Sequence, residues 1–211
     1  MAAHSANISS LAGGGVTAHD PIFRDDLFAE PTGWLLFHAD GRMTQRLRIE
    51  GGGAMFTETR LVIRAPVEAI VAKLQGAWTW WREGQYRNRV EHLDGTIQYE
   101  HFPLRFMIHV DSTMYPPLPL DREGVRIRIE ILDYMSGTLY FDVLPRLDGA
   151  SEFCSRFAGV RVTGPFRFLP YNGYVAARIH LLAERGDFPY PRGTGFAGLV
   201  DELEGHARAS T

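Results

Sequence analysis

The sequence lacks most of what a redox, metal-dependent or nucleophilic enzyme requires. It has one cysteine, Cys154, which excludes an intramolecular disulfide and suits a reducing compartment. It contains no GxSxG nucleophile elbow, no CxxC pair and no HExxH zinc motif. Because Cys154 lies in a segment that alternates like a strand, we expect a small buried residue there and not a nucleophile.

Long apolar runs and an excess of charge are also missing. No run approaches the roughly 18 apolar residues of a membrane-spanning helix, so no integral membrane association is expected. The formal net charge of −3 gives no electrostatic reason to expect a nucleic acid as partner. The first residues do not have the pattern of a secretory signal, and a cytoplasmic location is expected.

The composition is that of a globular protein, with 45% hydrophobic and 22% charged residues. Residues 1–20 are small, polar and glycine-rich, which predicts a flexible tail, and residues 21–211 are predicted to form a single domain. Two apolar segments flank Asp40-Gly41 and predict a β-hairpin over 34–49. Three consecutive glycines, 51–53, then form a joint.

The most informative stretch is 56–81, which changes its hydrophobic period once. Residues 56–64 alternate as a strand does, and Pro66 then opens a helix whose apolar residues recur at helical spacing. Gly76 ends that helix. Immediately afterwards come three tryptophans, Trp78, Trp80 and Trp81.

Five later segments alternate in the way that strands do. In 125–131 four aliphatic residues lie opposite Arg126, Arg128 and Glu130, which predicts a strand with one buried and one solvated face. The predicted strands lie within 87–102, which turns at Asp94-Gly95, and around 106–111, 125–131, 138–144 and 151–162.

Two helices are predicted after the strands. Residues 174–185 place Val175, Ile179 and Leu182 on one face, and a last amphipathic helix is expected over 195–208. Residues 193–198 match GxGxxG, the pattern of dinucleotide-binding turns. They follow a proline-rich loop instead of a strand, so we interpret them as a glycine-rich helix start.

The order of these signals resembles a known superfamily. A strand ending in Ala65-Pro66, a short helix and a tryptophan-rich segment are similar to the opening of START-like domains, also called helix-grip or SRPBCC. The segment 139–157, LYFDVLPRLDGASEFCSRF, resembles the penultimate hairpin of that superfamily. The resemblance covers about 55–185. It implies an α+β fold in which a curved antiparallel sheet wraps around a C-terminal helix, with the hairpin 34–49 as an addition.

The superfamily includes polyketide cyclase/aromatases and lipid-transfer domains, so the resemblance implies a cavity for a hydrophobic or aromatic small molecule. His101 shares a strand face with Tyr99 and Ile97, where a histidine could act as general acid or base. A hydrogen-bonded core histidine is the alternative. Tyr99 and Tyr134 are the further candidates for moving protons.

Candidate ligand-binding residues are aromatic or cationic. Tryptophans would form a wall of the cavity, phenols would bind a carbonyl or phenolate, and a guanidinium would hold an anionic group. The alternatives are core packing and amphipathic surface cover. The candidates are Trp80, Trp81, Tyr115, Tyr140, Tyr174 and Arg178. His109 and Asp111 share a face that is predicted to be solvated, and no metal site is predicted.

Three hypotheses about function remain open. The first is an enzyme of the cyclase, aromatase or lyase kind that works by acid/base chemistry and needs no cofactor. The second is a non-catalytic carrier or sensor of a lipid or aromatic ligand. The third is an interaction protein that uses the hairpin 34–49 and the last helix to bind a partner or a second copy of itself, as in a homodimer.

Overall fold

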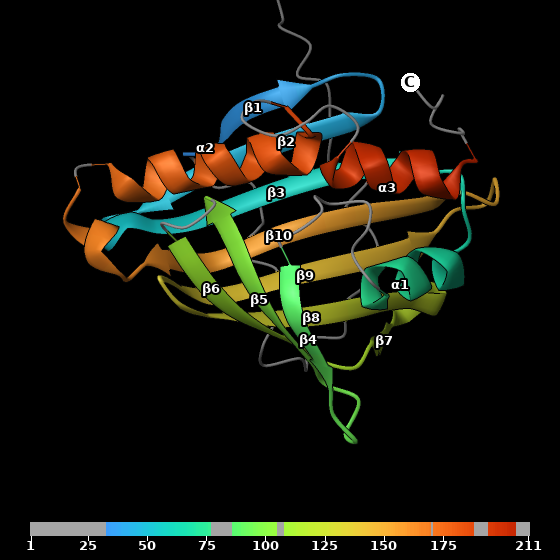
Figure 1. The fold of residues 1–211 in the computed structure, drawn as a ribbon. Coiled ribbons are helices and arrows are strands. Elements are labelled where there is room, and N and C mark those ends of the chain that lie inside the picture. The colour runs from blue at the N-terminus through green and yellow to red at the C-terminus, as the bar shows by residue number, and fades with distance from the viewer. Residues whose placement is uncertain (1–32, 77–85, 105–107, 170, 188–193, 206–211) are drawn as a thin grey trace, which may run out of the picture.

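The computed structural model describes residues 33–76, 86–104, 108–169, 171–187 and 194–205. This part of the chain forms one curved antiparallel sheet of ten strands and three α-helices (Figure 1). The strands are β1 (Leu35–Ala39), β2 (Met43–Glu50), β3 (Ala54–Ile63), β4 (Tyr86–Glu91), β5 (Ile97–Leu104), β6 (Ile108–Met114), β7 (Leu118–Leu120), β8 (Gly124–Asp133), β9 (Met135–Pro145) and β10 (Ser151–Val162). The helices are α1 (Val67–Gln75), α2 (Asn172–Arg185) and α3 (Gly195–Leu203).

The strand order is β1-β2-β3-β10-β9-β8-β6-β5-β4, and the short β7 pairs with β8. All of these pairs are antiparallel. Helices α2 and α3 follow one another along one face of the sheet, and α1 lies over the same face near β8 and β9 (Figure 1). We call this the inner face and the opposite one the outer face. The predicted α+β fold, with its curved sheet, C-terminal helix and N-terminal hairpin, is confirmed.

The β1–β2 hairpin turns where the sequence predicts, because Asp40 holds the turn. Its Oδ1 accepts hydrogen bonds of 2.7 Å from the backbone N–H groups of both Arg42 and Met43. The second oxygen lies 2.9 Å from His38 Nε2. The backbone donor of Arg42 is the main reason that the pKa of Asp40 falls to about 2.

Glycines set the close approach of α2 and α3 to their neighbours. Gly186 ends α2 in the left-handed region, with a φ of 74°, and a Cβ there would collide with the Thr194 carbonyl. Gly195 starts α3 with a φ of 65°, and a Cβ there would collide with the Ala183 carbonyl. The glycine-rich motif at 193–198 therefore contains a helix start, as the sequence predicts, although 193 itself lies outside the described residues.

Two sequence predictions about faces are wrong. The outer face of β8 is not solvated throughout: Arg126 is buried because it forms a two-point ion pair with Asp142 on β9. On α2 the buried side is Gly173, Ala177, Leu181, Ala183 and Glu184. Of the predicted apolar face, Ile179 packs against the core but Val175 is exposed, because the small residues Gly173 and Ala177 allow their own side of the helix to approach the sheet more closely.

Candidate functional site

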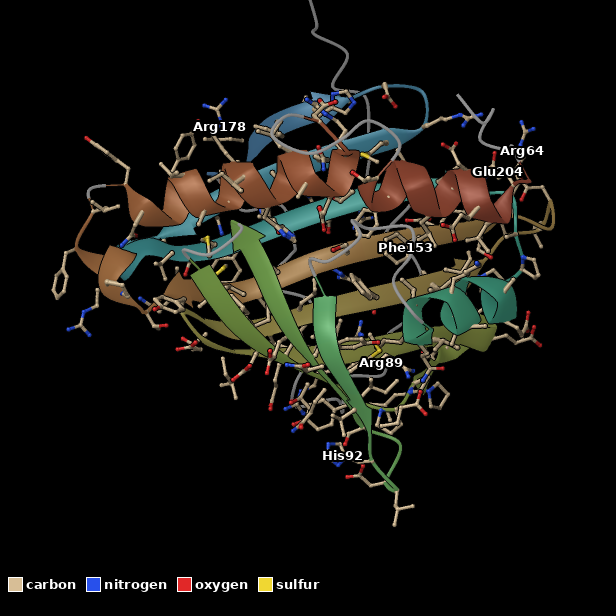
Figure 2. The ribbon with its side chains drawn as sticks, in the orientation of Figure 1. Arg64, Arg89, His92, Phe153, Arg178 and Glu204 are labelled. Carbon is tan, nitrogen blue, oxygen red and sulfur yellow. The ribbon has the colours of Figure 1, made fainter. Side chains whose placement is uncertain are left out.

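The inner face is mostly apolar. Its aliphatic and aromatic residues alternate along each strand and form one continuous buried cluster with residues of the three helices. Phe141, Phe153 and Phe196 pack at its centre, with ring centroids 4.8–6.1 Å apart. Figure 2 shows Phe153 on the side of the sheet that α3 covers. A face of this kind suits contact with an apolar molecule.

A group of buried polar side chains interrupts the inner face beneath α2. We call it the polar cluster, and its members are Gln45, Thr59, Ser155, His180 and Glu184. The hydroxyls of Thr59 and Ser155 each donate a hydrogen bond of 2.5 Å to the Glu184 carboxylate. His180 Nε2 lies 3.0 Å from the same carboxylate. Three strands and one helix thus direct polar groups to one point.

The strand register places three members of the polar cluster side by side. Gln45 on β2 pairs with Thr59 on β3, and Thr59 pairs with Ser155 on β10. All three occupy inward positions, because strand side chains alternate between faces. His180 and Glu184 are four residues apart on α2 and therefore lie on one side of that helix. The cluster follows directly from the register and the helical period.

His180 is held by stacking. Its ring stacks on Phe157, with centroids 3.8 Å apart and an interplanar angle of 15°. Its Nε2 lies close to Glu184 but makes no hydrogen bond in the described part of the chain. The stacking therefore sets the plane of the imidazole.

Gln45 leaves one hydrogen-bond acceptor open. Its side chain is fully buried, and its Nε2 donates to Thr59 Oγ1 at 3.1 Å and to the Leu181 carbonyl at 2.9 Å. The amide cannot be turned around without setting its oxygen against the Leu181 carbonyl, so this contact fixes the orientation. Oε1 is buried and has no hydrogen-bond partner in the described part of the chain. Buried acceptors of this kind are rare and call for a partner.

The polar cluster was not predicted from the sequence. A signal was present: Ser155 is a polar residue at an inward position between Phe153 and Phe157. The i, i+4 spacing of His180 and Glu184 was a second signal. Neither signal identifies a site by itself, because the strand order is needed to bring these residues together. Strand β10 pairs with β3, from which it is far apart in the sequence.

The predicted proton carriers lie in different places. Tyr99 is buried on the inner face, where its hydroxyl donates to the Gly76 carbonyl at 3.4 Å, and burial raises its pKa. Tyr134 lies at the corner between β8 and β9, and its carbonyl accepts the backbone N–H groups of Thr163 and Gly164. His101 belongs to β5, but its side chain lies outside the described residues.

Two predicted ligand-binding tyrosines lie on the outer face. Tyr115 donates a hydrogen bond of 2.6 Å to Glu130, and the guanidinium of Arg128 lies 4.5 Å from its ring centroid. Tyr140 is buried, and the guanidinium of Arg126 lies 5.4 Å from its ring. The sheet therefore separates these two phenols from the polar cluster.

Tyr174 and Arg178 lie on the exposed side of α2. The Arg178 guanidinium lies 5.6 Å from the Tyr174 ring and 5.7 Å from that of Phe37 on β1. Figure 2 shows Arg178 projecting from the side of α2 that faces away from β10. Trp80 and Trp81 fall outside the described residues. The structure brings Tyr174 and Arg178 together, but not with the other described candidates.

Cys154 is buried on the outer face, as expected of a structural residue. Burial is the main reason that the pKa of its thiol lies well above the ordinary value. A thiol that stays protonated is a poor nucleophile. In the described ranges, no three His, Cys, Asp or Glu side chains gather as metal ligands. The described helices also include none that is long and apolar enough to span a membrane.

Comparison with known proteins finds similarity in structure and not in sequence. No protein-family model matches the chain, and no curated protein matches it in sequence. Human STARD10 matches 82% of this chain with 78% of its own, at 13% identity and a TM-score of 0.59. Human StAR-related lipid transfer protein 5 matches 86% with 91% of its own, at 8% identity and a TM-score of 0.58. A fragment of the STAR-related lipid transfer protein from Xanthomonas axonopodis matches 76% with 97% of its own, at 12% identity and a TM-score of 0.54. At identities this low, the structural similarity shows a common fold and nothing more.

Proposed function

We propose that this chain, which has the START-like, helix-grip fold of the SRPBCC superfamily, binds a hydrophobic small molecule against the inner face of its sheet and carries it without changing it. Two of the structural neighbours are named as lipid transfer proteins, which supports this proposal. The observation that carries it is the polar cluster: one open buried acceptor, Gln45 Oε1, within an apolar inner face. An apolar surround with a few placed polar groups is the usual make-up of a small-molecule site.

The chemistry of the polar cluster selects the polar group of the ligand. Gln45 Oε1 and the Glu184 carboxylate are both hydrogen-bond acceptors, and the carboxylate also carries a negative charge. A ligand hydroxyl or protonated amine would donate to this site, whereas a carboxylate or phosphate would be repelled. The ligand class that fits is therefore an apolar alcohol or amine. The anion-binding role considered for Arg178 does not belong to this site, since Arg178 lies on the other side of α2.

The energetic advantage comes from the open acceptor. An unsatisfied buried acceptor costs about 1–3 kcal/mol, and a ligand that donates to it removes that cost. A ligand of the same shape without a donor leaves the cost in place. The site should therefore prefer an alcohol over its methyl ether by about tenfold, which corresponds to about 1.4 kcal/mol.

The catalytic hypothesis stays a separate prediction. It needs proton carriers around the bound molecule, and of its candidates Tyr99 is buried with its hydroxyl directed at a backbone carbonyl. Under the carrier proposal, Tyr99→Phe and Tyr134→Phe leave ligand binding unchanged, and the ligand is recovered intact after long incubation with the protein. If the protein converts the ligand chemically and Tyr99→Phe or Tyr134→Phe abolishes the conversion, the enzyme hypothesis replaces the carrier proposal.

The test begins with native mass spectrometry of the purified protein and identification of any small molecule that co-purifies. Binding is then measured for alcohols, amines, carboxylic acids and methyl ethers built on one apolar skeleton. We expect the alcohol and amine to bind and the acid to bind at least about tenfold more weakly. Gln45→Met should remove the preference for alcohol over ether. Gln98→Met, at an exposed position of β5, is the matched control. Failure of every compound to bind would leave the interaction-protein hypothesis.

A further inference from the structure

The charge of this chain is unevenly distributed along the sequence. No Asp or Glu occurs between Glu152 and Glu184, while that interval contains Arg156, Arg161, Arg167 and Arg178. The formal net charge of −3 conceals this local excess of positive charge. The interval includes most of β10, the 3-10 turn Pro165–Phe168 and most of α2.

The same interval exposes large apolar side chains. Phe168 is 77% exposed and Leu169 55% exposed, in and just after the 3-10 turn. Tyr171 is 83% exposed, directly before α2, and Val175 is 51% exposed on the first turns of that helix. Tyr174, Val175 and Arg178 follow the spacing i, i+1, i+4 on the exposed side of α2, and Tyr171 directly precedes the helix.

A hollow adjoins these residues. It has a volume of about 500 Å³ and lies where the first turn of α2 meets the β1–β2 hairpin. Its lining side chains include Leu35 on β1, Ile49 on β2 and the rings of Tyr171 and Tyr174, with Asn172 as a polar member. The hairpin and the helix thus contribute to one continuous, partly apolar surface.

Among the described residues, no carboxylate neutralises the exposed arginines of this surface. The Arg167 guanidinium lies 4.5 Å from the Phe168 ring, and Arg178 lies over Tyr174 and Phe37. Within the ranges that the structure describes, neither Arg167 nor Arg178 takes part in an ion pair. Glu50, at the end of β2, is already paired with Arg48 at 2.8 Å. Both exposed arginines can therefore bind an external anion.

We propose that this surface docks on an anionic phospholipid bilayer. We call it the docking surface and define it by its exposed residues Arg167, Phe168, Leu169, Tyr171, Val175 and Arg178. Arginines attract an anionic lipid surface, while Phe, Tyr and Leu enter the boundary between headgroups and acyl chains. Aromatic and cationic side chains without acidic ones are the combination that an anionic interface favours. A bilayer meets the charge requirement over the whole surface, whereas a protein partner would need a matching acidic patch.

Docking of this kind is peripheral and needs no membrane-spanning helix. It goes beyond the proposed ligand site, because the docking surface lies on the exposed side of α2 and the polar cluster on the buried side. The two proposals can therefore fail separately. Loss of vesicle binding with intact ligand binding would overturn the docking proposal alone.

The test is flotation of the full chain with two kinds of vesicle. One is phosphatidylcholine, and in the other about a third of the lipid is phosphatidylserine. We expect binding to the phosphatidylserine vesicles and weaker binding to pure phosphatidylcholine. Each arginine near the membrane contributes about fivefold in partitioning, so Arg167→Gln with Arg178→Gln should lower binding by about 25-fold. Phe168→Ser with Leu169→Ser should also reduce it, since both exposed side chains would enter the interface.

A matched control exists at the β9–β10 turn. Arg146 and the fully exposed Leu147 offer the same pair of residue types far from α2 in the fold. Arg146→Gln with Leu147→Ser should leave vesicle binding unchanged. The proposal is overturned if phosphatidylserine vesicles fail to bind the chain, if the surface variants bind as the wild type does, or if the control loses binding equally. Should the variants not fold, added salt must still weaken wild-type binding, and insensitivity to salt would overturn the proposal.

Discussion

The Thr59 hydroxyl donates a hydrogen bond of 2.5 Å to the Glu184 carboxylate, joining two residues that are 125 positions apart in the sequence. This contact ties α2 to the inner face of β3. Ser155 on β10 binds the second oxygen of the same carboxylate. One buried anion therefore holds the helix against two neighbouring strands, and the ligand site and the stability of the fold depend on the same group.

Glu184→Gln should destabilise the protein by about 2–4 kcal/mol. Both carboxylate oxygens accept hydrogen bonds from hydroxyls. The amide lacks the charge that strengthens these bonds, and its nitrogen cannot accept, so one hydroxyl must turn to accept a hydrogen bond from it instead. The free energy of unfolding in urea measures the effect. Glu68→Gln, on the exposed side of α1, is the control and should cost less than about 1 kcal/mol. Equal losses for the two variants would contradict the stabilising role of the buried carboxylate.

The ion pairs on the outer face predict that substituting Asp142 destabilises the protein more than substituting Arg126. This buried carboxylate accepts two hydrogen bonds from Arg126, at 2.6 and 3.0 Å, and is also bound by Arg156. Asp142→Asn removes the anion that faces the buried Arg126 and the partly buried Arg156, and should cost about 3–5 kcal/mol. Arg126→Met should cost less, because Asp142 keeps Arg156. Chemical unfolding of both variants checks this order, and a greater loss for Arg126→Met would show that Asp142 is not the centre of the group.

Asp40 predicts a contribution to stability that depends on pH. Its folded-state pKa of about 2 lies below the ordinary value of 3.8, so the ionised form stabilises the fold. That contribution is complete above pH 3.8 and is lost as the pH falls through about 2. We expect the stability difference between wild type and Asp40→Asn to shrink over this interval. Unfolding curves at several acidic pH values measure it, and a difference that does not change with pH would refute the assignment.

The sequence predicted the elements well because their signals are local. Alternation found most of the strands, Asp40-Gly41 found the first hairpin, and Pro66 with Gly76 bounded α1. It did not find β7, which has three residues and no alternation to detect. Local patterns suffice wherever one residue or one turn determines the geometry.

The faces and the site were harder to predict because they depend on which strands become neighbours. Arg126 resembles a solvated residue until β9 places Asp142 beside it. Val175 fits an apolar helix face, but the close approach of Gly173 to the chain beneath α2 turns another side of the helix inward. The polar cluster needs β2, β3 and β10 in register, and no local pattern contains that information.

Gly173→Ala tests this close approach, because the sign of the change in the free energy of unfolding shows whether the contact is present. In an ordinary helix the change from glycine to alanine stabilises by about 1 kcal/mol. Here the added Cβ would collide with the Gly53 carbonyl oxygen, a backbone atom that cannot move as a side chain does. We expect a loss of about 1–3 kcal/mol in the free energy of unfolding, the usual cost of overpacking. Gly41→Ala is the control, because a Cβ at Gly41 meets no atom within 4 Å. If Gly173→Ala stabilised the protein, α2 would not be held against the Gly51–Gly53 turn as this close contact indicates.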